Sequence, residues 1–143
     1  MDRALIEHKL ESLRRCLQRV QDHCPPTVAE LTRDADAQDI ITLNLMRAVQ
    51  RCVDLAAHVL ADSASAAPQS MAESFTRLAA ADVIDAELAE RLRRAVGFRN
   101  VAVHSYRAID WHVVHAIAQT HLHDFSAFAR QVQGHALRGA ARE

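Results

Sequence analysis

The residues best suited to chemistry lie in one short segment, Gly97 to Tyr106, which reads GFRNVAVHSY. Arg99 carries a permanent positive charge that can bind a phosphate or a carboxylate. His104 is of a type that titrates near neutral pH and can take up or release a proton during a reaction. Asn100 and His104 are four residues apart, so on a helix they share a face and can act on one group. The segment therefore combines an anion-binding group with a candidate acid–base group.

The surroundings of this segment favour an anionic ligand. Residues 91–109 contain five arginines and neither aspartate nor glutamate. An inward guanidinium needs an anion, because an unpaired buried charge is costly, and this anion is either Asp54 or a phosphate of a ligand. An ordinary interpretation also stays open, in which Arg99 forms an ion pair, His104 caps the helix and Tyr106 lies on the surface. The inward stripe in which Arg99 falls consists otherwise of Leu88, Leu92, Ala95, Val96, Ala102 and Val103.

Composition and periodicity predict an all-α protein, an up-and-down bundle of about five helices that forms a single domain over residues 1–143. Hydrophobic residues make up 50% of the chain, and only three glycines and three prolines are present, which suits helices with short connections. Apolar residues recur at spacings of three and four, the periodicity of an amphipathic helix. The tail after about residue 134 is expected to fray. Side chains able to cap helix N-termini occur at Thr27, Ser70, Asp85 and Asp110.

The longest expected helix runs from about Asp39 to Ala61 and carries apolar residues on two nearly opposite faces. A surface helix is normally apolar on one face only, so we expect this helix to be buried nearly all round. In a chain of 143 residues, that burial predicts a homodimer in which a second copy covers one side. A polar stripe that includes Arg47, Arg51 and Asp54 either faces solvent or lines a cleft and supports the site.

Other classes of site are disfavoured. The net charge of −1 indicates no general affinity for nucleic acids or membranes. No apolar run approaches the roughly 20 residues needed to span a bilayer. Three cysteines without C-x-x-C spacing predict reduced thiols in a cytoplasmic protein. No Gly-rich phosphate loop is present, so we expect no cofactor, and His112 and His115 lack a third ligand, so we expect no metal site.

Arg99, His104 and Tyr106 form the pattern R-x4-H-x-Y. This pattern resembles the R-x4-6-H signature of the HEPN superfamily, in the form found in its HepT toxin branch. The similarity extends over most of the chain. The stretch AVQRCVDLAAHVLAD, residues 48–62, resembles the long second helix of that branch, and residues 72–110 resemble its third and fourth helices. The run GFRN followed by VHSY is the most specific part of the resemblance.

The resemblance implies a HEPN-like helical fold and a metal-independent endoribonuclease that dimerises, so that two Arg/His sets line a shared cleft. His104 would act on the ribose 2′-hydroxyl or on the leaving oxygen, and Arg99 would stabilise the charge that develops on the scissile phosphate. Asn100 would orient the phosphate or the histidine, and Tyr106 would contact RNA. The expected product is a 2′,3′-cyclic phosphate.

The resemblance also implies a protein partner. In the HepT branch, a minimal nucleotidyltransferase antitoxin (MntA-like) silences the toxin by transferring AMP to the motif tyrosine, here Tyr106. Two other interpretations remain open at this stage. One is a non-catalytic subunit of a two-component nucleotidyltransferase, in which Arg99 and His104 bind a nucleotide or phosphate without doing chemistry. The other is a purely structural partner.

Overall fold

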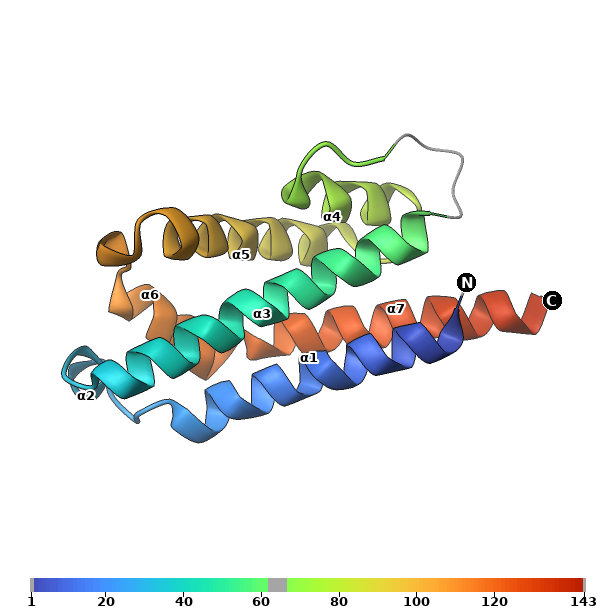
Figure 1. The fold of residues 1–143 in the computed structure, drawn as a ribbon. Helices are drawn as coiled ribbons and strands as arrows, with labels where there is room; N and C mark the ends of the chain where they lie inside the picture. The colour runs from blue at the N-terminus through green and yellow to red at the C-terminus, as the bar shows by residue number, and fades with distance from the viewer. Residues whose placement is uncertain (1, 62–66, 143) are drawn as a thin grey trace.

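The structure of the chain, a computed structural model, describes residues 2–61 and 67–142. Over these ranges the chain is helical and contains no β-strand, which confirms the predicted all-α class (Figure 1). The elements follow in the order α1 (Arg3–His23), α2 (Val28–Thr32), α3 (Ala35–Leu60), α4 (Met71–Ala80), α5 (Ala86–His104), the 3-10 helix η1 (Tyr106–Ala108), α6 (Trp111–Ala116), the π-helix η2 (Ile117–His121) and α7 (Leu122–Arg142).

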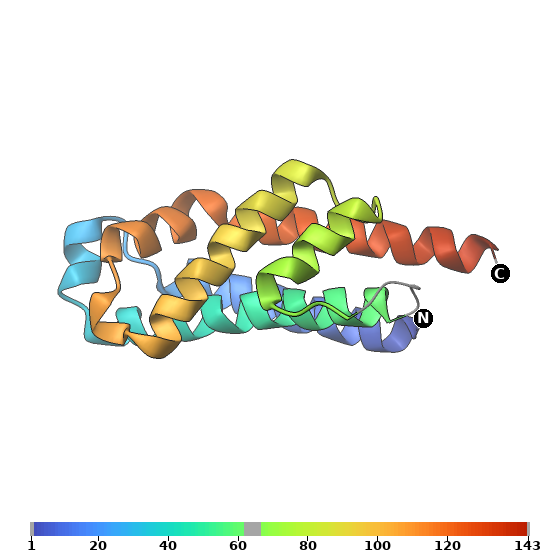
Figure 2. The same ribbon diagram turned by 90° about the horizontal axis from the view of Figure 1, so that it is seen from above.

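Helices α1, α3 and α7 run up and down along a common direction, and α4 and α5 cross them obliquely (Figures 1 and 2). Helices α1 and α3 lie side by side and make the most extensive contact of any pair in the described residues. Helices α4 and α5 pack on another side of α3, and α7 lies along α1 and α3 (Figures 1 and 2). Because α6, η2 and α7 follow without interruption, the described residues form five main helical segments and the short α2, as the predicted up-and-down bundle requires.

Local hydrogen bonds explain where several helices begin. All four capping side chains identified in the sequence accept a hydrogen bond from a backbone N–H two or three residues further on, at 2.7–3.2 Å. A cap of this kind satisfies one of the backbone donors that have no partner within the helix. The sequence therefore identified these helix starts correctly, at Thr27, Ser70, Asp85 and Asp110.

Helix α3 begins earlier than expected. Asp34 caps it, since its Oδ1 accepts a hydrogen bond from the backbone N–H of Ala37 at 3.0 Å. The first helical residue is therefore Ala35, about one turn before the expected start at Asp39. Asp39 consequently lies inside the helix and projects its carboxylate from the helix surface rather than capping the end.

The single chain buries one side of α3 and leaves another apolar face open, and the covering of that face by a second copy stays a prediction. The stripe that includes Ile41, Leu45 and Cys52 is buried in the core, between α1 and the other helices. On another face, Leu43 keeps 45% of its surface exposed and Met46 is only partly buried. Six described helices contact α3, namely α1, α2, α4, α5, α6 and α7, but they leave Leu43 open to solvent.

Helix α7 extends beyond the point where we expected fraying. It remains helical from Leu122 to Arg142, past residue 134. Ala136 is buried at 8% exposure, so an apolar contact with the core continues into the last turns and holds them in place. Leu137, the next residue, faces solvent with 50% of its surface exposed.

Candidate functional site

The candidate motif occupies the last turns of α5 and the first residues after it. Asp85 starts the helix, and buried Leu88, Leu92 and Val96 hold its inner face against the core. The helix ends at His104, and the backbone N–H of the next residue still bonds to the carbonyl of Val101 at 2.8 Å. The packing therefore fixes the helix on which Arg99, Asn100 and His104 sit.

The inward stripe of α5 ends one residue sooner than predicted. Ala102 is buried, but Val103 is 42% exposed, so its assignment to the inward stripe is wrong. Successive residues on a helix are turned by about 100° from one another, so Ala102 faces the core while Val103 is turned away from it. Val103 adds an apolar side chain to the surface of the motif region.

Arg99 is half-buried, in agreement with its expected position near the inner face. Its Nη1 donates a hydrogen bond to Oδ1 of the neighbouring Asn100 at 3.2 Å. Within residues 2–61 and 67–142, no carboxylate forms an ion pair with this guanidinium. A half-buried cation that has only an amide oxygen as a partner retains the capacity to bind an anion.

Asp54 is not the counter-ion of Arg99. Its carboxylate instead contacts Nζ of Lys9 at 3.4 Å, Nε2 of Gln50 at 2.9 Å and Nη1 of Arg51 at 3.6 Å. The Lys9 contact ties α3 to α1, and the other two contacts lie within α3. The reason is that the polar stripe of α3 packs along α1, which the helix periodicity alone did not reveal.

The other two members of the polar stripe also belong to the α1 side. Arg51 donates from Nε to Oγ of Ser12 at 2.9 Å. Arg47 is exposed, and its charge, like that of Arg51, acts to lower the pKa of the Cys16 thiol on α1, although burial raises that pKa overall. In the part of the chain that the structure describes, no hydrogen bond or ion pair connects Arg47, Arg51 or Asp54 with Arg99 or His104.

His104 is exposed and ends α5. Its imidazole makes no hydrogen bond or ion pair with any described residue, so both ring nitrogens are available to a ligand. Arg99 lies five residues earlier, which corresponds to about 140° around a regular helix. Since α5 stays helical up to His104, a single chain does not direct these two side chains to one point.

Tyr106, in η1, is held by a residue far away in the sequence. Its hydroxyl donates a hydrogen bond to Oδ1 of Asp39 on α3 at 2.6 Å. Its ring packs edge-on against Trp111, with 6.0 Å between the ring centroids. Partial burial and the adjacent Asp39 carboxylate raise the pKa of Tyr106 to about 12. The phenol is thus protonated at neutral pH and is still 41% exposed.

Sequence reasoning missed Asp39. The residue was identified only as the approximate start of α3, where an aspartate is typical of a helix cap. Nothing in the local sequence connects it with a tyrosine 67 positions away. The sequence indicated only that Tyr106 follows a helix, so that its side chain would pack against some neighbouring element.

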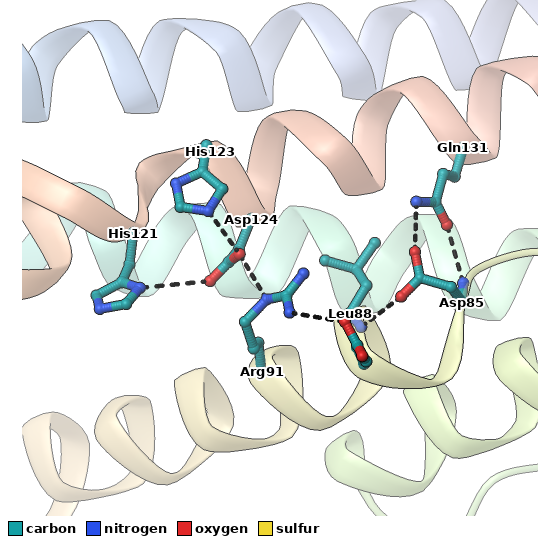
Figure 3. Close-up of polar contacts among 8 residues, drawn as sticks. Asp85, Leu88, Arg91, His121, His123, Asp124 and Gln131 are labelled. Carbon is teal, nitrogen blue, oxygen red and sulfur yellow. Dashed lines mark hydrogen bonds and ion pairs between the residues drawn. The ribbon is translucent and has the colours of Figure 1, made fainter.

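A separate cavity of about 490 Å³ lies on another face of α5, between α5 and the α6–η2–α7 segment. Its walls are mainly apolar and include Phe98, Val101 and Ile117. At one end, the nearly buried carboxylate of Asp124 accepts a hydrogen bond from Nε of Arg91 at 2.7 Å (Figure 3). Arg99, His104 and Tyr106 do not line this cavity.

Three histidines outside the motif contact other groups of the chain, and the three cysteines are not arranged as reactive thiols. His115 contacts the carbonyl of Pro25 at 2.9 Å, and His121 and His123 flank Asp124 (Figure 3). No group of three or more potential metal ligands occurs among the described residues. Burial raises the pKa of all three cysteines, which are free thiols, so none is activated as a nucleophile. Among the described helices, none has the length and apolar character needed to cross a membrane.

Comparisons with known proteins agree in sequence and in structure. A family model described as "Ribonuclease HepT-like" matches residues 13–132. The mRNA nuclease HepT of Shewanella oneidensis is 35% identical over 124 residues, which cover 87% of this chain and 92% of that protein. The structure resembles a tri-AMPylated HEPN toxin of the same organism in complex with its MNT antitoxin, with a TM-score of 0.86, 33% identity and coverage of 94% of this chain and 99% of that one.

Two further solved structures are similar, one in sequence and structure and the other in fold alone. A toxin–antitoxin complex with AMP-PNP contains a chain that matches with a TM-score of 0.85 and 32% identity over 92% of this chain and 99% of that one. The cytosolic protein YutE from Bacillus subtilis shares only the fold, at 13% identity and a TM-score of 0.80 over 94% and 90% of the two chains. The family match covers well over half of the sequence. This chain belongs to the HepT-like ribonuclease family.

Proposed function

We propose that this protein is the toxin of a toxin–antitoxin pair and that it cleaves RNA as a metal-independent endoribonuclease in the cytoplasm. The observation that carries the proposal is Arg99, a half-buried guanidinium without a carboxylate partner among the described residues, on the same helix as the unpaired imidazole of His104. The similarity to an mRNA nuclease of the same family supports it. The three free thiols suit a reducing compartment.

In the proposed reaction the RNA supplies its own nucleophile. The 2′-hydroxyl oxygen attacks the adjacent phosphorus, the bond from phosphorus to the 5′-oxygen of the next nucleotide breaks, and a 2′,3′-cyclic phosphate forms. His104 takes the proton from the 2′-hydroxyl or gives one to the leaving oxygen. Arg99 binds the non-bridging oxygens and stabilises the charge that grows on them. Asn100, bonded to Arg99, orients this guanidinium or the phosphate.

The proposed active form is a homodimer. Leu43 on α3 lies one helical turn after Asp39, the residue that binds Tyr106, so the open apolar face of α3 begins beside the motif. Val103, at 42% exposure, adds an apolar side chain from α5. A second copy that covers these side chains brings a second Arg/His set to the same cleft, which compensates for the divergence of Arg99 and His104 within one chain.

The proposed partner is a minimal nucleotidyltransferase antitoxin that transfers AMP to Tyr106. The similar Shewanella toxin is AMPylated and bound to an MNT antitoxin, which supports this partner. Tyr106 is the single tyrosine of the chain and exposes 41% of its surface two positions after His104. A nucleotide attached there adds bulk and negative charge beside the groups that are proposed to bind RNA.

Cleavage of RNA by the purified full-length protein in excess EDTA tests the nuclease. We expect cleavage by the wild type, products with 2′,3′-cyclic phosphate ends, and a loss of about 10²–10⁴-fold in the His104→Ala variant. His8→Ala is the matched control, because His8 is an exposed histidine on α1. If neither wild type nor His8→Ala cleaves RNA under conditions where both are folded, the nuclease proposal fails. Binding of nucleotide without cleavage would instead favour a substrate-binding subunit.

A further inference from the structure

The hydrogen bond between Tyr106 and Asp39 connects a proposed modification site with a carboxylate of the same chain. The distance of 2.6 Å from the phenol oxygen to Oδ1 is short, as expected when the acceptor is charged. Asp39 is exposed on α3, and no lysine, arginine or histidine among the described residues forms an ion pair with it. The edge-on contact with Trp111 limits how far the tyrosine ring can turn away.

From this geometry we infer that Asp39 is the proton acceptor for nucleotidyl transfer to Tyr106, so that the toxin supplies a catalytic group for its own inactivation. The inference rests on the proposed silencing of the protein by AMP transfer. It assigns a role to a residue of the protein that accepts the AMP, while the partner enzyme supplies the nucleoside triphosphate.

A base is needed because the phenol is a poor nucleophile while it holds its proton. Burial and the Asp39 carboxylate raise the pKa of Tyr106 to about 12, so the phenolate is scarce at neutral pH. A carboxylate already in hydrogen-bond contact can remove the proton as the new bond forms. The same contact thus keeps the resting tyrosine neutral and prepares it for transfer.

The nucleotide donor is ATP held by the partner enzyme, and one AMP group is transferred. The phenol oxygen of Tyr106 forms a bond to the α-phosphorus, and the bond from that phosphorus to the oxygen bridging to the β-phosphate breaks. Pyrophosphate leaves with the bonding electrons, and the phenolic proton passes to Oδ1 of Asp39. The modified oxygen then has no hydrogen to donate, and its phosphodiester is negatively charged, so it no longer binds the Asp39 carboxylate once this loses its proton.

Loss of the contact between Tyr106 and Asp39 has a structural consequence for the motif. The contact with Asp39 joins η1 to α3, immediately after the last residue of α5. When the modified tyrosine leaves Asp39, η1 loses this tie, and the nucleotide is free to lie over the surface that carries His104. We therefore expect faster amide hydrogen exchange in residues 105–109 after modification than before it.

The rate of modification of the Asp39→Asn variant tests the inference. The full-length variant is incubated with the minimal nucleotidyltransferase antitoxin and ATP, and the added AMP is followed by intact mass spectrometry. Asparagine has nearly the same shape as aspartate but cannot accept the proton, so we expect labelling about 100-fold slower than in the wild type. Asp39→Glu, which restores a carboxylate, should recover part of the rate. Asp36→Asn, an exposed aspartate on the same helix, is the matched control and should be labelled normally.

A spectroscopic titration shows whether Asp39 acts through the phenol. Because the chain has a single tyrosine, absorbance of the phenolate reports Tyr106 alone. We expect its pKa to fall from about 12 toward the ordinary value of 10.0 in Asp39→Asn. Circular dichroism establishes that each variant is folded. Equal labelling rates for wild type and Asp39→Asn would overturn the inference, whereas no labelling of the wild type would instead overturn the proposed silencing by AMP transfer.

Discussion

Helix α5 carries two partly buried arginines, of which one forms an ion pair with a buried carboxylate and the other does not. Near the start of the helix, Nε of Arg91 is bonded to the buried carboxylate of Asp124 at 2.7 Å. Two turns later, Arg99 has only the amide oxygen of Asn100 as a partner. Arg91 and Arg99 are the same residue type on the same helix, so residue type and helix position do not distinguish a structural arginine from a candidate functional one. The presence or absence of a carboxylate from another element does.

The difference arises from what packs beside each half of α5. The first half meets α7, where Asp124 lies between His121 and His123 and joins the two helices (Figure 3). The second half runs through a stretch of sequence without acidic residues and ends at the exposed His104. Arg91 therefore has a carboxylate partner from another helix, whereas no described carboxylate pairs with Arg99.

Among the changes that test the contrast between Arg91 and Arg99, the largest effect is expected from Arg99→Ala. RNA cleavage should fall by about 10²–10³-fold, because the phosphate loses the group that stabilises its developing charge. Thermal stability should stay close to that of the wild type, since this guanidinium makes no ion pair with a described residue. Initial cleavage rates and a thermal unfolding curve on the same sample measure both quantities. A large loss of stability would mean that Arg99 is structural, like Arg91.

Two exposed valines near different faces of α5, Val103 and Val113, provide the next contrast. Val103→Asp places a charge on the apolar face beside the motif, and we expect the dimer to dissociate and cleavage to fall with it. Val113→Asp changes a residue of similar exposure, 48% against 42%, on the wall of the separate cavity and should leave the dimer intact. Analytical ultracentrifugation across a range of concentrations measures the change. Dissociation by both variants, or by Val113→Asp alone, would contradict the proposed interface.

Arg91→Ala should affect stability rather than chemistry. Removal of the guanidinium leaves the Asp124 carboxylate, only 9% exposed, without its strongest partner. We expect the free energy of unfolding to fall by about 1–3 kcal/mol in urea titrations. Arg93→Ala is the control, because its ion pair with Glu90 is solvent-exposed and should contribute less than about 1 kcal/mol. Equal losses of unfolding free energy in Arg91→Ala and Arg93→Ala would show that the ion pair with buried Asp124 stabilises the fold no more than an exposed pair does.

The smallest effect concerns pH and the cap of α5. Hydrogen bonds from the backbone N–H of Leu88 and from Gln131 lower the pKa of Asp85 below its ordinary value of 3.8 (Figure 3). A carboxyl group whose pKa is lower in the folded state stabilises the fold above the unfolded value, and this contribution disappears as the pH falls through the folded value. Asp85→Asn should therefore lose less stability than the wild type between pH 5 and pH 3. Urea unfolding at several pH values compares the wild type with Asp85→Asn. Identical dependence of their stabilities on pH would refute a lowered pKa of Asp85.

Local features of the fold could be predicted from the sequence because they depend on neighbours in the chain. Ser70 and Asp85 cap helices through hydrogen bonds to backbone groups three residues away, and such contacts form whatever the tertiary structure is. The apolar stripe of α5 was predicted correctly up to Ala102 for the same reason. It failed at Val103, because the coverage of a side chain at the edge of the stripe depends on the neighbouring helices as well as on the helix period.

The partners of the site residues could not be predicted, since they come from distant elements. Asp54 was a reasonable counter-ion for Arg99 on charge alone, but the rotation of α3 turns it toward Lys9 on α1. The direction in which a polar stripe faces depends on how two helices pack, and a single helical period does not contain that information. The same holds for Asp39, which lies 67 residues from Tyr106.

The sequence by itself determined the all-α class, most helix starts, the R-x4-H-x-Y pattern and the acid-free surroundings of Arg99, because each depends on residue types and short spacings. Only the tertiary structure decided that Arg91 is neutralised and Arg99 is not, and that Tyr106 rests on Asp39. The physical reason is that hydrogen bonds and ion pairs act over a few ångströms. Which distant side chains come within that range is determined by the packing of the helices.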